Sequence, residues 1–187
     1  MQETQSSNNQ DNHKIAGSED SPPEGFREAK IWEILETVCD PEVPVLSIID
    51  LGIVRDVVLK VSPFGGDLEW AEIIITPTYT GCPAMDMIAM NIKLALIGHG
   101  YKNIKVTSVL SPAWTTDWMS EEGKIKLKAY GIAPPAYGAG RLERPGPCCP
   151  QCNSANTKVI SEFGSTACKA LYQCNDCKEP FDYFKCH

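Results

Sequence analysis

The 187-residue sequence has no surplus of positive charge and no long apolar run. It carries 17 basic against 24 acidic side chains, so it lacks the basic footprint of a nucleic-acid-binding protein. No stretch approaches the roughly 18 apolar residues of a membrane span. The N-terminus shows no charged start followed by an apolar stretch, so no secretory signal is visible. These absences predict a soluble, cytoplasmic protein without a nucleic-acid or membrane partner.

Histidine is also scarce, whereas cysteine is abundant. The three histidines, His13, His99 and His187, do not stand in a catalytic-looking context. The chain has 9 cysteines, an odd number, and seven of them lie in the last 40 residues. In a chain without a secretory signal, this density indicates metal or thiol chemistry rather than a disulfide scaffold.

Two C-x-x-C pairs dominate the C-terminal part of the chain. They are Cys149 with Cys152 and Cys174 with Cys177, separated by 21 residues. Two such pairs supply four thiolates to one tetrahedral ion, which favours zinc, with iron as the main competitor. Buried or oxidised cysteines are the simpler alternative. The intervening segment alternates well enough for two short strands, with a turn at Gly164.

Three further cysteines lie close to these pairs. Cys148 could replace Cys149 as a ligand, although Cys149 gives the usual knuckle spacing. Cys168 and Cys186 have two interpretations: buried small hydrophobic residues, or a second, labile metal or cluster site. The spacing alone does not decide between them.

The rest of the sequence predicts an α+β domain flanked by less ordered segments. Residues 1–24 are polar and are expected to be a disordered tail. Apolar and β-branched patterns over residues 25–131 predict the order αββαβα with a small three-stranded sheet. Residues 132–147 read as a Pro/Gly linker, and residues 148–187 as the metal ribbon. The expected elements are a helix from Phe26 to Val38, strands Ile53–Val61 and Glu69–Pro77, a helix Cys82–Gly98, a strand Ile104–Leu110 and a helix Glu121–Tyr130.

Cys82 is the candidate reactive residue of the α+β domain. It follows a strand and precedes Pro83 at the start of an expected helix, where partial positive charge stabilises a thiolate. It is therefore a candidate nucleophile or soft-metal ligand, although a buried structural cysteine fits equally well. No neighbouring residue in the sequence offers itself as a base, which disfavours a thiol enzyme.

Acidic residues gather in the irregular stretch before the first expected strand. They are Asp40, Glu42 and Asp50, and their simplest interpretation is helix-end and turn chemistry. A loop after the third strand contains Trp114 and Trp118. Core packing explains these two tryptophans, and a docking surface is the alternative.

Three stretches resemble the SufT-like iron–sulfur cluster assembly domain: DPEVPVLSIIDLG, TPTYTGCPAMD and SPAWTTDWMS. The C-terminal run SEFGSTACKALYQCNDCKEPFDYFKC extends the likeness to the D subunits of bacterial phenylacetyl-CoA epoxidases. The resemblance covers residues 26 to 187, and the combination of the two parts is more specific than either alone. The longer N-terminal tail and Asn153, where knuckles often carry glycine, depart from the family pattern.

The resemblance implies an accessory role in phenylacetate catabolism rather than catalysis. It implies maturation of the epoxidase complex, by helping to insert an iron–sulfur cluster into the reductase component. Cys82 becomes the transfer thiol, Thr80 and Gly81 frame its loop, and the acidic motif comprises Asp40, Glu42 and Asp50. The four ribbon cysteines become zinc ligands. The resemblance also favours a second metal or cluster site at Cys168 and Cys186. The implied partners are the oxygenase and reductase subunits, and a homodimer sharing a transient cluster fits as well.

Two other functions compete with cluster assembly. A structural adaptor would dock the oxygenase components through the ribbon and the Trp114/Trp118 loop, without cluster chemistry. A nucleic-acid-binding ribbon is disfavoured because the module has equal numbers of lysines and acidic residues.

Overall fold

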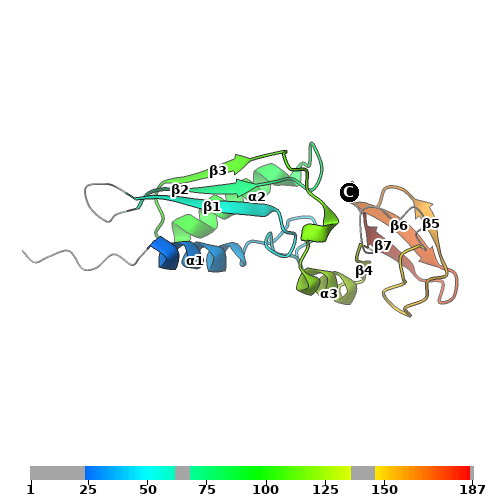
Figure 1. Ribbon diagram of the computed structural model, residues 1–187. Helices are drawn as coiled ribbons and strands as arrows, with labels where there is room; N and C mark the ends of the chain where they lie inside the picture. Colours follow the sequence, from blue (N-terminus) through cyan, green and yellow to red (C-terminus); the bar gives the residue numbers. More distant parts are fainter. Residues whose placement is uncertain (1–23, 62–67, 136–145, 186–187) are drawn as a thin grey trace, which may run out of the picture.

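The computed structural model describes residues 24–61, 68–135 and 146–185. Residues 1–23 of the expected tail, residues 136–145 of the expected linker and Cys186 lie outside these ranges. Within them, the α+β class and the order αββαβα are confirmed, and a ribbon sheet follows (Figure 1). The elements are α1 (Glu24–Leu35), β1 (Val54–Val61), β2 (Leu68–Ile75), α2 (Ala84–Gly98), β3 (Ile104–Ser108), η1 (Thr116–Trp118), α3 (Glu121–Ala129), β4 (Ile132–Ala133), β5 (Thr157–Ser161), β6 (Lys169–Cys174) and β7 (Pro180–Phe184).

The first sheet has the strand order β1-β2-β3. Strands β1 and β2 are antiparallel, and β3 is parallel to β2, so that helix α2 makes the crossover between them. Figure 1 shows α1 and α2 running along this sheet. Alternate residues of β2 (Ala71, Ile73 and Ile75) are buried, as the period of a half-covered strand requires. They pack with the apolar faces of α1 and α2 in one core.

Two helix ends differ from the sequence expectation. Helix α1 ends at Leu35 instead of Val38, because the Thr37 hydroxyl donates to the Ile34 carbonyl at 2.7 Å in a closing turn. Helix α2 begins at Ala84, with Pro83 as its N-cap, so Cys82 lies just before the helix. The chain reaches Pro83 through Gly81, whose φ of 84° is accessible mainly to glycine.

Gly52 marks a close approach between the acidic loop and the Trp118 loop. Its φ is 67°, and a Cβ placed there would lie 2.1 Å from the Trp118 carbonyl oxygen. Only glycine therefore lets these two backbone segments meet. The Arg55 guanidinium covers the Trp118 ring at 3.6 Å, which fixes the same corner from the other side.

The ribbon forms a second, four-stranded sheet of order β4-β7-β6-β5. The sequence predicts strands on either side of Gly164, and β5 and β6 lie there. No strand was predicted at β7, whose buried residues are Phe181 and Phe184. Ile132 and Ala133, at the start of the expected linker, form β4 and pair in parallel with β7. The chain thus enters the ribbon sheet directly after α3.

The two sheets are joined by a continuous apolar contact. Trp114 is 3% exposed, lies edge-on to Phe184 of the ribbon, and donates its indole N–H to the Leu51 carbonyl at 2.9 Å. Phe184 and Cys168 belong to the same core cluster as Ile31 and Ile88. Trp114 therefore does not form a docking surface, because its ring is buried in the junction between the two sheets.

No helix in the described ranges is long and apolar enough to cross a membrane.

Candidate functional site

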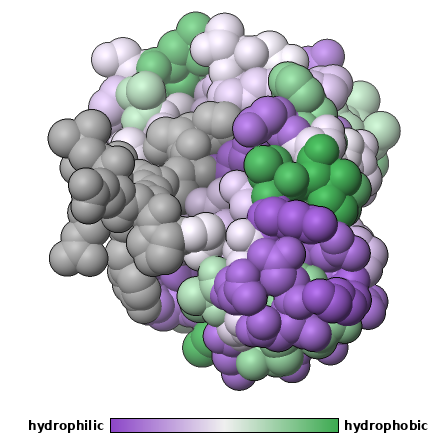
Figure 2. Space-filling view, turned by 90° about the vertical axis from the view of Figure 1, so that its right-hand side faces the viewer, coloured by the Kyte–Doolittle hydropathy of each residue, from purple (hydrophilic) through white to green (hydrophobic). Residues whose placement is uncertain are grey.

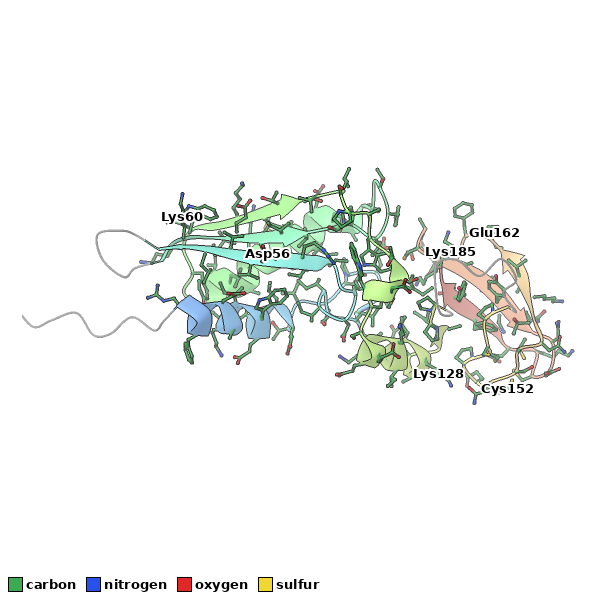
Figure 3. The ribbon with its side chains drawn as sticks, viewed as in Figure 1. Asp56, Lys60, Lys128, Cys152, Glu162 and Lys185 are labelled. Carbon is green, nitrogen blue, oxygen red and sulfur yellow. The ribbon has the colours of Figure 1, made fainter. Side chains whose placement is uncertain are left out.

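The four cysteines of the two C-x-x-C pairs converge on one point. Their sulfurs all lie within 4.8 Å of one another, with Cys149 and Cys177 at 3.7 Å and Cys152 and Cys174 at 3.5 Å. A tetrahedral ion with bonds of about 2.3 Å to sulfur needs edges of about 3.8 Å. The spacing thus fits a tetrahedral four-thiolate ion. Figure 3 shows Cys152 in the outer part of the ribbon, away from the first sheet.

Backbone geometry holds both metal-binding turns. Asn153 and Lys178, the residues after each pair, have φ values of 60° and 69°. Asparagine tolerates this left-handed conformation, as expected for Asn153, whereas nothing in the sequence signalled the same geometry at Lys178. The N–H groups of Cys177 and Asp176 donate to the Cys174 sulfur and lower the pKa of Cys174 to about 7. Such hydrogen bonds favour the thiolate form that a metal needs.

Cys82 lies in the turn between β2 and α2. Its backbone N–H donates to the Tyr79 carbonyl at 3.3 Å, and its own carbonyl accepts from Met85 at the same distance. The side chain is partly buried against the main core. Its sulfur receives hydrogen bonds from the Tyr79 side chain and the Ala84 backbone. The thiol is thus fixed by contacts rather than free in solvent.

The helix N-terminus does not dominate the electrostatics of Cys82. Burial raises the pKa of the Cys82 thiol, and the nearby Glu42 and Asp40 carboxylates raise it further. The hydrogen bonds from Ala84 and Tyr79 oppose this shift without cancelling it. In the metal-free protein, burial therefore opposes the stabilised thiolate that the helix position suggests.

Asp40 and Glu42 lie in a turn whose carboxylates act electrostatically on Cys82. The Asp40 carboxylate accepts from the backbone N–H groups of Glu42 and Val43 at 2.7 and 2.8 Å. This is the turn chemistry that the sequence suggested for aspartate. By closing the turn, Asp40 directs Glu42 toward the thiols, where its carboxylate oxygen lies 3.8 Å from the sulfur of Cys168.

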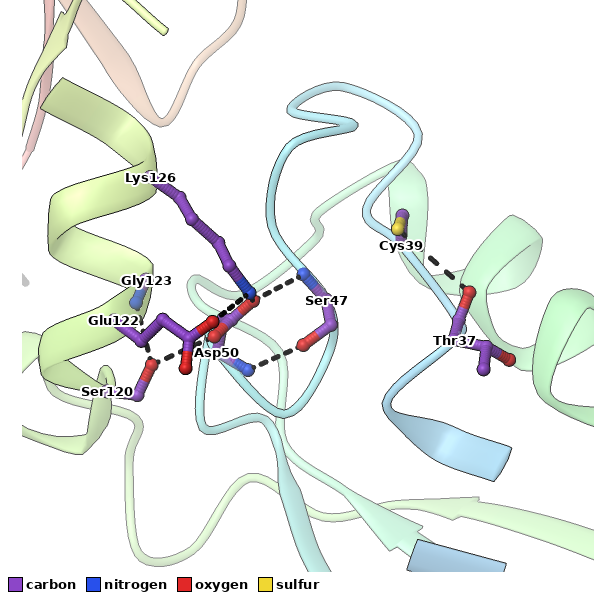
Figure 4. Close-up of polar contacts among 8 residues, drawn as sticks. All are labelled: Thr37, Cys39, Ser47, Asp50, Ser120, Glu122, Gly123 and Lys126. Carbon is purple, nitrogen blue, oxygen red and sulfur yellow. Dashed lines mark hydrogen bonds and ion pairs between the residues drawn. The ribbon is translucent and has the colours of Figure 1, made fainter. Parts of the chain in front are cut away.

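Asp50 has a different environment from the other two acidic residues (Figure 4). It is 6% exposed and accepts from the Ser47 backbone at 3.1 Å, the Ser120 hydroxyl at 3.0 Å and the Lys126 ammonium at 2.8 Å. Burial alone would raise the pKa of Asp50, but the hydrogen bonds, led by that from Lys126, lower it. Asp50 thus ties the acidic loop to α3, and the contacts of the described residues do not bring it to Cys82.

Thr80 and Gly81 lie where the sequence placed them, beside Cys82. Thr80 lines a cavity of about 370 Å³ together with Thr76, Thr78 and Tyr79 of the same segment and Leu110, Ala113 and Trp114 of the loop opposite. Gly81 provides the left-handed turn. Tyr79 is the residue that sequence reasoning missed. Burial and its contact with Cys82 raise the pKa of Tyr79 to about 12, so its hydroxyl stays protonated and can donate.

Comparison with known proteins supports both parts of this architecture. Residues 28–110 match the family described as iron–sulfur cluster assembly protein, and residues 134–185 match the PaaD zinc beta ribbon domain. An Fe–S protein maturation auxiliary factor from Porphyromonas gingivalis is 33% identical over 101 residues, 54% of this chain and 90% of that protein.

Two solved structures are similar to about half of the chain. A domain of unknown function from Bacillus anthracis is 31% identical, with a TM-score of 0.48 over 55% of this chain and 92% of that one. A conserved hypothetical protein from Thermotoga maritima is 26% identical, with a TM-score of 0.41 over 54% and 92% of the two chains.

One relative matches across both parts. A protein from Escherichia coli strain K12, provisionally described as the D subunit of 1,2-phenylacetyl-CoA epoxidase, is 48% identical over 158 residues. The match spans 84% of this chain and 92% of that protein, and therefore includes the Cys82 loop. On this likeness, the chain belongs to the family of the D subunits of 1,2-phenylacetyl-CoA epoxidase.

Proposed function

We propose that this protein is a non-catalytic maturation factor of the phenylacetyl-CoA epoxidase complex, which helps to insert an iron–sulfur cluster into the reductase component. The observation that carries the proposal is the environment of Cys82, a fixed, half-buried thiol between Tyr79 and the Asp40–Glu42 turn. The matches to an iron–sulfur assembly family and to an epoxidase subunit point to the same role.

The electrostatics of Cys82 suit a ligand that binds and releases a cargo. Without metal, burial and the neighbouring carboxylates keep the thiol protonated and unreactive. A positively charged iron centre reverses that balance, because it stabilises the thiolate and lets it bind. A site with few sulfur bonds also gives up its cargo more readily than the four-cysteine centre of the ribbon.

Zinc in the four-cysteine centre has a structural role in this proposal. All four donors are thiolates at tetrahedral spacing, which leaves no open position for a substrate. The ribbon has only a small core cluster of its own, made of Ala133, Cys149, Cys174 and Phe181. The metal therefore replaces a hydrophobic core. Accordingly, residues 25–131 are proposed as the assembly domain, residues 148–187 as the zinc ribbon, and the segment between as the connection.

Co-production of the reductase with and without this protein tests the proposal. Iron and acid-labile sulfide per reductase should be higher when the protein is present, and a Cys82→Ser variant should remove the gain. Cys39→Ser is the matched control, because Cys39 is an exposed thiol in the same domain. Equal cluster content in all four samples would contradict the assembly function.

A structural adaptor without cluster chemistry is the second candidate. The observation in its favour is the outer strand of the ribbon sheet, β5, which exposes Val159 and Ile160, with Phe163 just beyond it. Figure 2 views this end of the molecule and shows green hydrophobic residues next to a purple hydrophilic area. Mixed surfaces of this kind are common in subunit interfaces.

Two variants separate the candidates. If Cys82→Ser leaves epoxidase activity intact while Val159→Ser with Ile160→Ser abolishes binding to the other subunits, the adaptor function is correct. A homodimer that shares one cluster between two Cys82 thiols is a further form of the assembly proposal. Sedimentation of the protein with and without a reconstituted cluster tests it, since only the loaded form should be dimeric.

A further inference from the structure

Cys168 is part of the ribbon in the sequence, but in the structure it lies at the junction between the ribbon and the first domain. Its side chain is 6% exposed and packs in the core cluster of the first domain. Its sulfur lies 3.8 Å from the Glu42 carboxylate and 3.0 Å from the Thr166 hydroxyl. Its carbonyl accepts from the Lys185 N–H at 2.9 Å, which anchors the loop to the end of β7. The ribbon thus presents one thiol to the acidic turn of the other domain.

Cys82 packs against the same core cluster and shares the electrostatic environment of Cys168. Glu42 and Asp40 act electrostatically on both Cys82 and Cys168. Tyr79, which hydrogen bonds to Cys82, also lies within the field of Cys168. Two thiols and two carboxylates therefore share one region. Lys169, a cation that acts on Cys168, forms an ion pair with Asp182 at 3.4 Å.

A buried polar group without a hydrogen-bond partner lies just after β2, ahead of the Cys82 loop. The Thr76 hydroxyl is 1% exposed and has no hydrogen-bond partner among the described residues. It lines the cavity of about 370 Å³ whose wall also contains Tyr79 and Thr80. An unsatisfied buried hydroxyl is costly in a fully packed interior, so this cavity favours a polar occupant, although Cys82, Cys168 and Glu42 are not part of its lining.

We propose that Cys82 and Cys168 together bind an iron atom as cargo, with Glu42 as an oxygen ligand, so that the ribbon completes the transfer site. The inference rests on the proposed assembly function and names the second ligand of its site. Each sulfur exchanges its proton for a bond to iron, and the protons pass to solvent without any change of oxidation state. The second thiol comes from the same chain, so one protomer suffices.

The donors are more loosely placed than those of the ribbon centre. Among the described residues, only the four ribbon cysteines form a group of three or more whose ligand atoms all lie within 4.8 Å of one another. Cys82, Cys168 and Glu42 must therefore draw together around the ion and separate when it leaves. This arrangement suits a transient cargo, whereas the preassembled ribbon centre suits a resident metal.

Anaerobic titration of the zinc-loaded full-length protein with Co²⁺ tests the shared site. Cobalt stands in for ferrous iron and gives a sulfur-to-metal absorption band that grows with the number of thiolate bonds. Zinc binds such sites more tightly than cobalt, so the ribbon centre keeps its zinc. The band should fall to about half in Cys82→Ser and in Cys168→Ser, and vanish in the double variant. Cys39→Ser and Cys148→Ser, which each remove an exposed thiol, should match the unaltered protein.

The outcomes separate the inference from the function on which it rests. A weaker band in Cys82→Ser with an unchanged band in Cys168→Ser overturns the shared site and leaves the assembly function standing. Unchanged bands in both variants remove both ideas. Zinc content and circular dichroism check folding, and Cys168→Ala provides an apolar replacement where the buried serine disturbs the core.

A second arm identifies the form of iron. Reconstitution with iron and sulfide should give a visible cluster spectrum that Cys82→Ser and Cys168→Ser both lose. If cobalt binding depends on the two thiols but the cluster spectrum does not, the cargo is a free ferrous ion. If neither readout depends on Cys168, the shared site is wrong.

Discussion

Trp114 and Phe184, which are 70 positions apart, meet edge-on with ring centroids 6.4 Å apart and planes inclined by 64°. One ring comes from the loop after β3 and the other from the last strand of the ribbon. The contact closes the junction at which Cys168 faces Glu42. The stability of this pair therefore bears directly on whether the proposed transfer site stays assembled.

Removing either ring should destabilise the protein strongly. Trp114→Ala and Phe184→Ala should each lower the free energy of unfolding by about 3–5 kcal/mol, because both rings are buried. The double variant should lose less than the sum, by the roughly 0.5–1.5 kcal/mol that an aromatic pair contributes. Urea unfolding measures all three. Phe163→Ala, at a 69% exposed position, is the control and should change little; fully additive losses would show that the rings do not interact.

Asp50 should make the free energy of unfolding depend on pH in the acidic range. Its pKa is lowered in the folded state, so its contribution is present above about pH 4, the ordinary range of an aspartate, and fades as the pH falls through the folded value. Asp50→Asn should cost about 2–3 kcal/mol at neutral pH, at the low end for a buried pair because Lys126 is 36% exposed. The difference from the unaltered protein should shrink below about pH 4.

Chemical denaturation at several pH values measures that difference. Asp117→Asn provides the control, since Asp117 is an exposed acidic residue in the neighbouring turn. A cost for Asp50→Asn that stays constant down to about pH 2 would mean that the Lys126 pair does not stabilise the charged form.

Removing one ribbon ligand should cost the bound metal. Cys174→Ser should reduce the metal content and unfold the ribbon, because metal binding contributes roughly 10–16 kcal/mol of apparent folding free energy to modules of this kind. Elemental analysis and backbone amide NMR spectra measure the two effects. Cys148→Ser should retain both metal and spectrum, since the exposed Cys148 lies outside the group of four. Loss of metal in Cys148→Ser instead would move the ligand assignment by one residue.

The Cys82 thiol should react slowly at neutral pH. Burial and the Glu42 and Asp40 charges raise its pKa above the ordinary value of 9.0, so little thiolate is present near pH 7.5. Iodoacetamide should therefore modify the exposed Cys39 before Cys82, as followed by mass spectrometry of the zinc-loaded protein. Glu42→Gln should accelerate modification of Cys82, because it removes a neighbouring negative charge. Faster labelling of Cys82 than of Cys39 would show that the helix field prevails after all.

Much of this architecture could be predicted from the spacing of residues close together in the sequence. Two C-x-x-C pairs predict a four-sulfur centre because each pair fixes two ligands through a short turn, whatever the rest of the chain does. The order αββαβα could be predicted from apolar periodicity, because that pattern is also local in the sequence. Strand β7 escaped prediction, since it is short and is stabilised by pairing with β6 and β4 rather than by its own composition.

Contacts between distant residues were decided by tertiary structure alone. Asp40, Glu42 and Asp50 look alike in sequence, yet Asp50 pairs with Lys126, 76 positions away, while Glu42 meets Cys168 across 126 positions. The sequence by itself determined a thiol before a helix and a four-cysteine ribbon. Only the docking of the ribbon onto the first domain placed a second thiol beside the acidic turn, because burial and electrostatic fields depend on what packs against a residue, not on its neighbours in the chain.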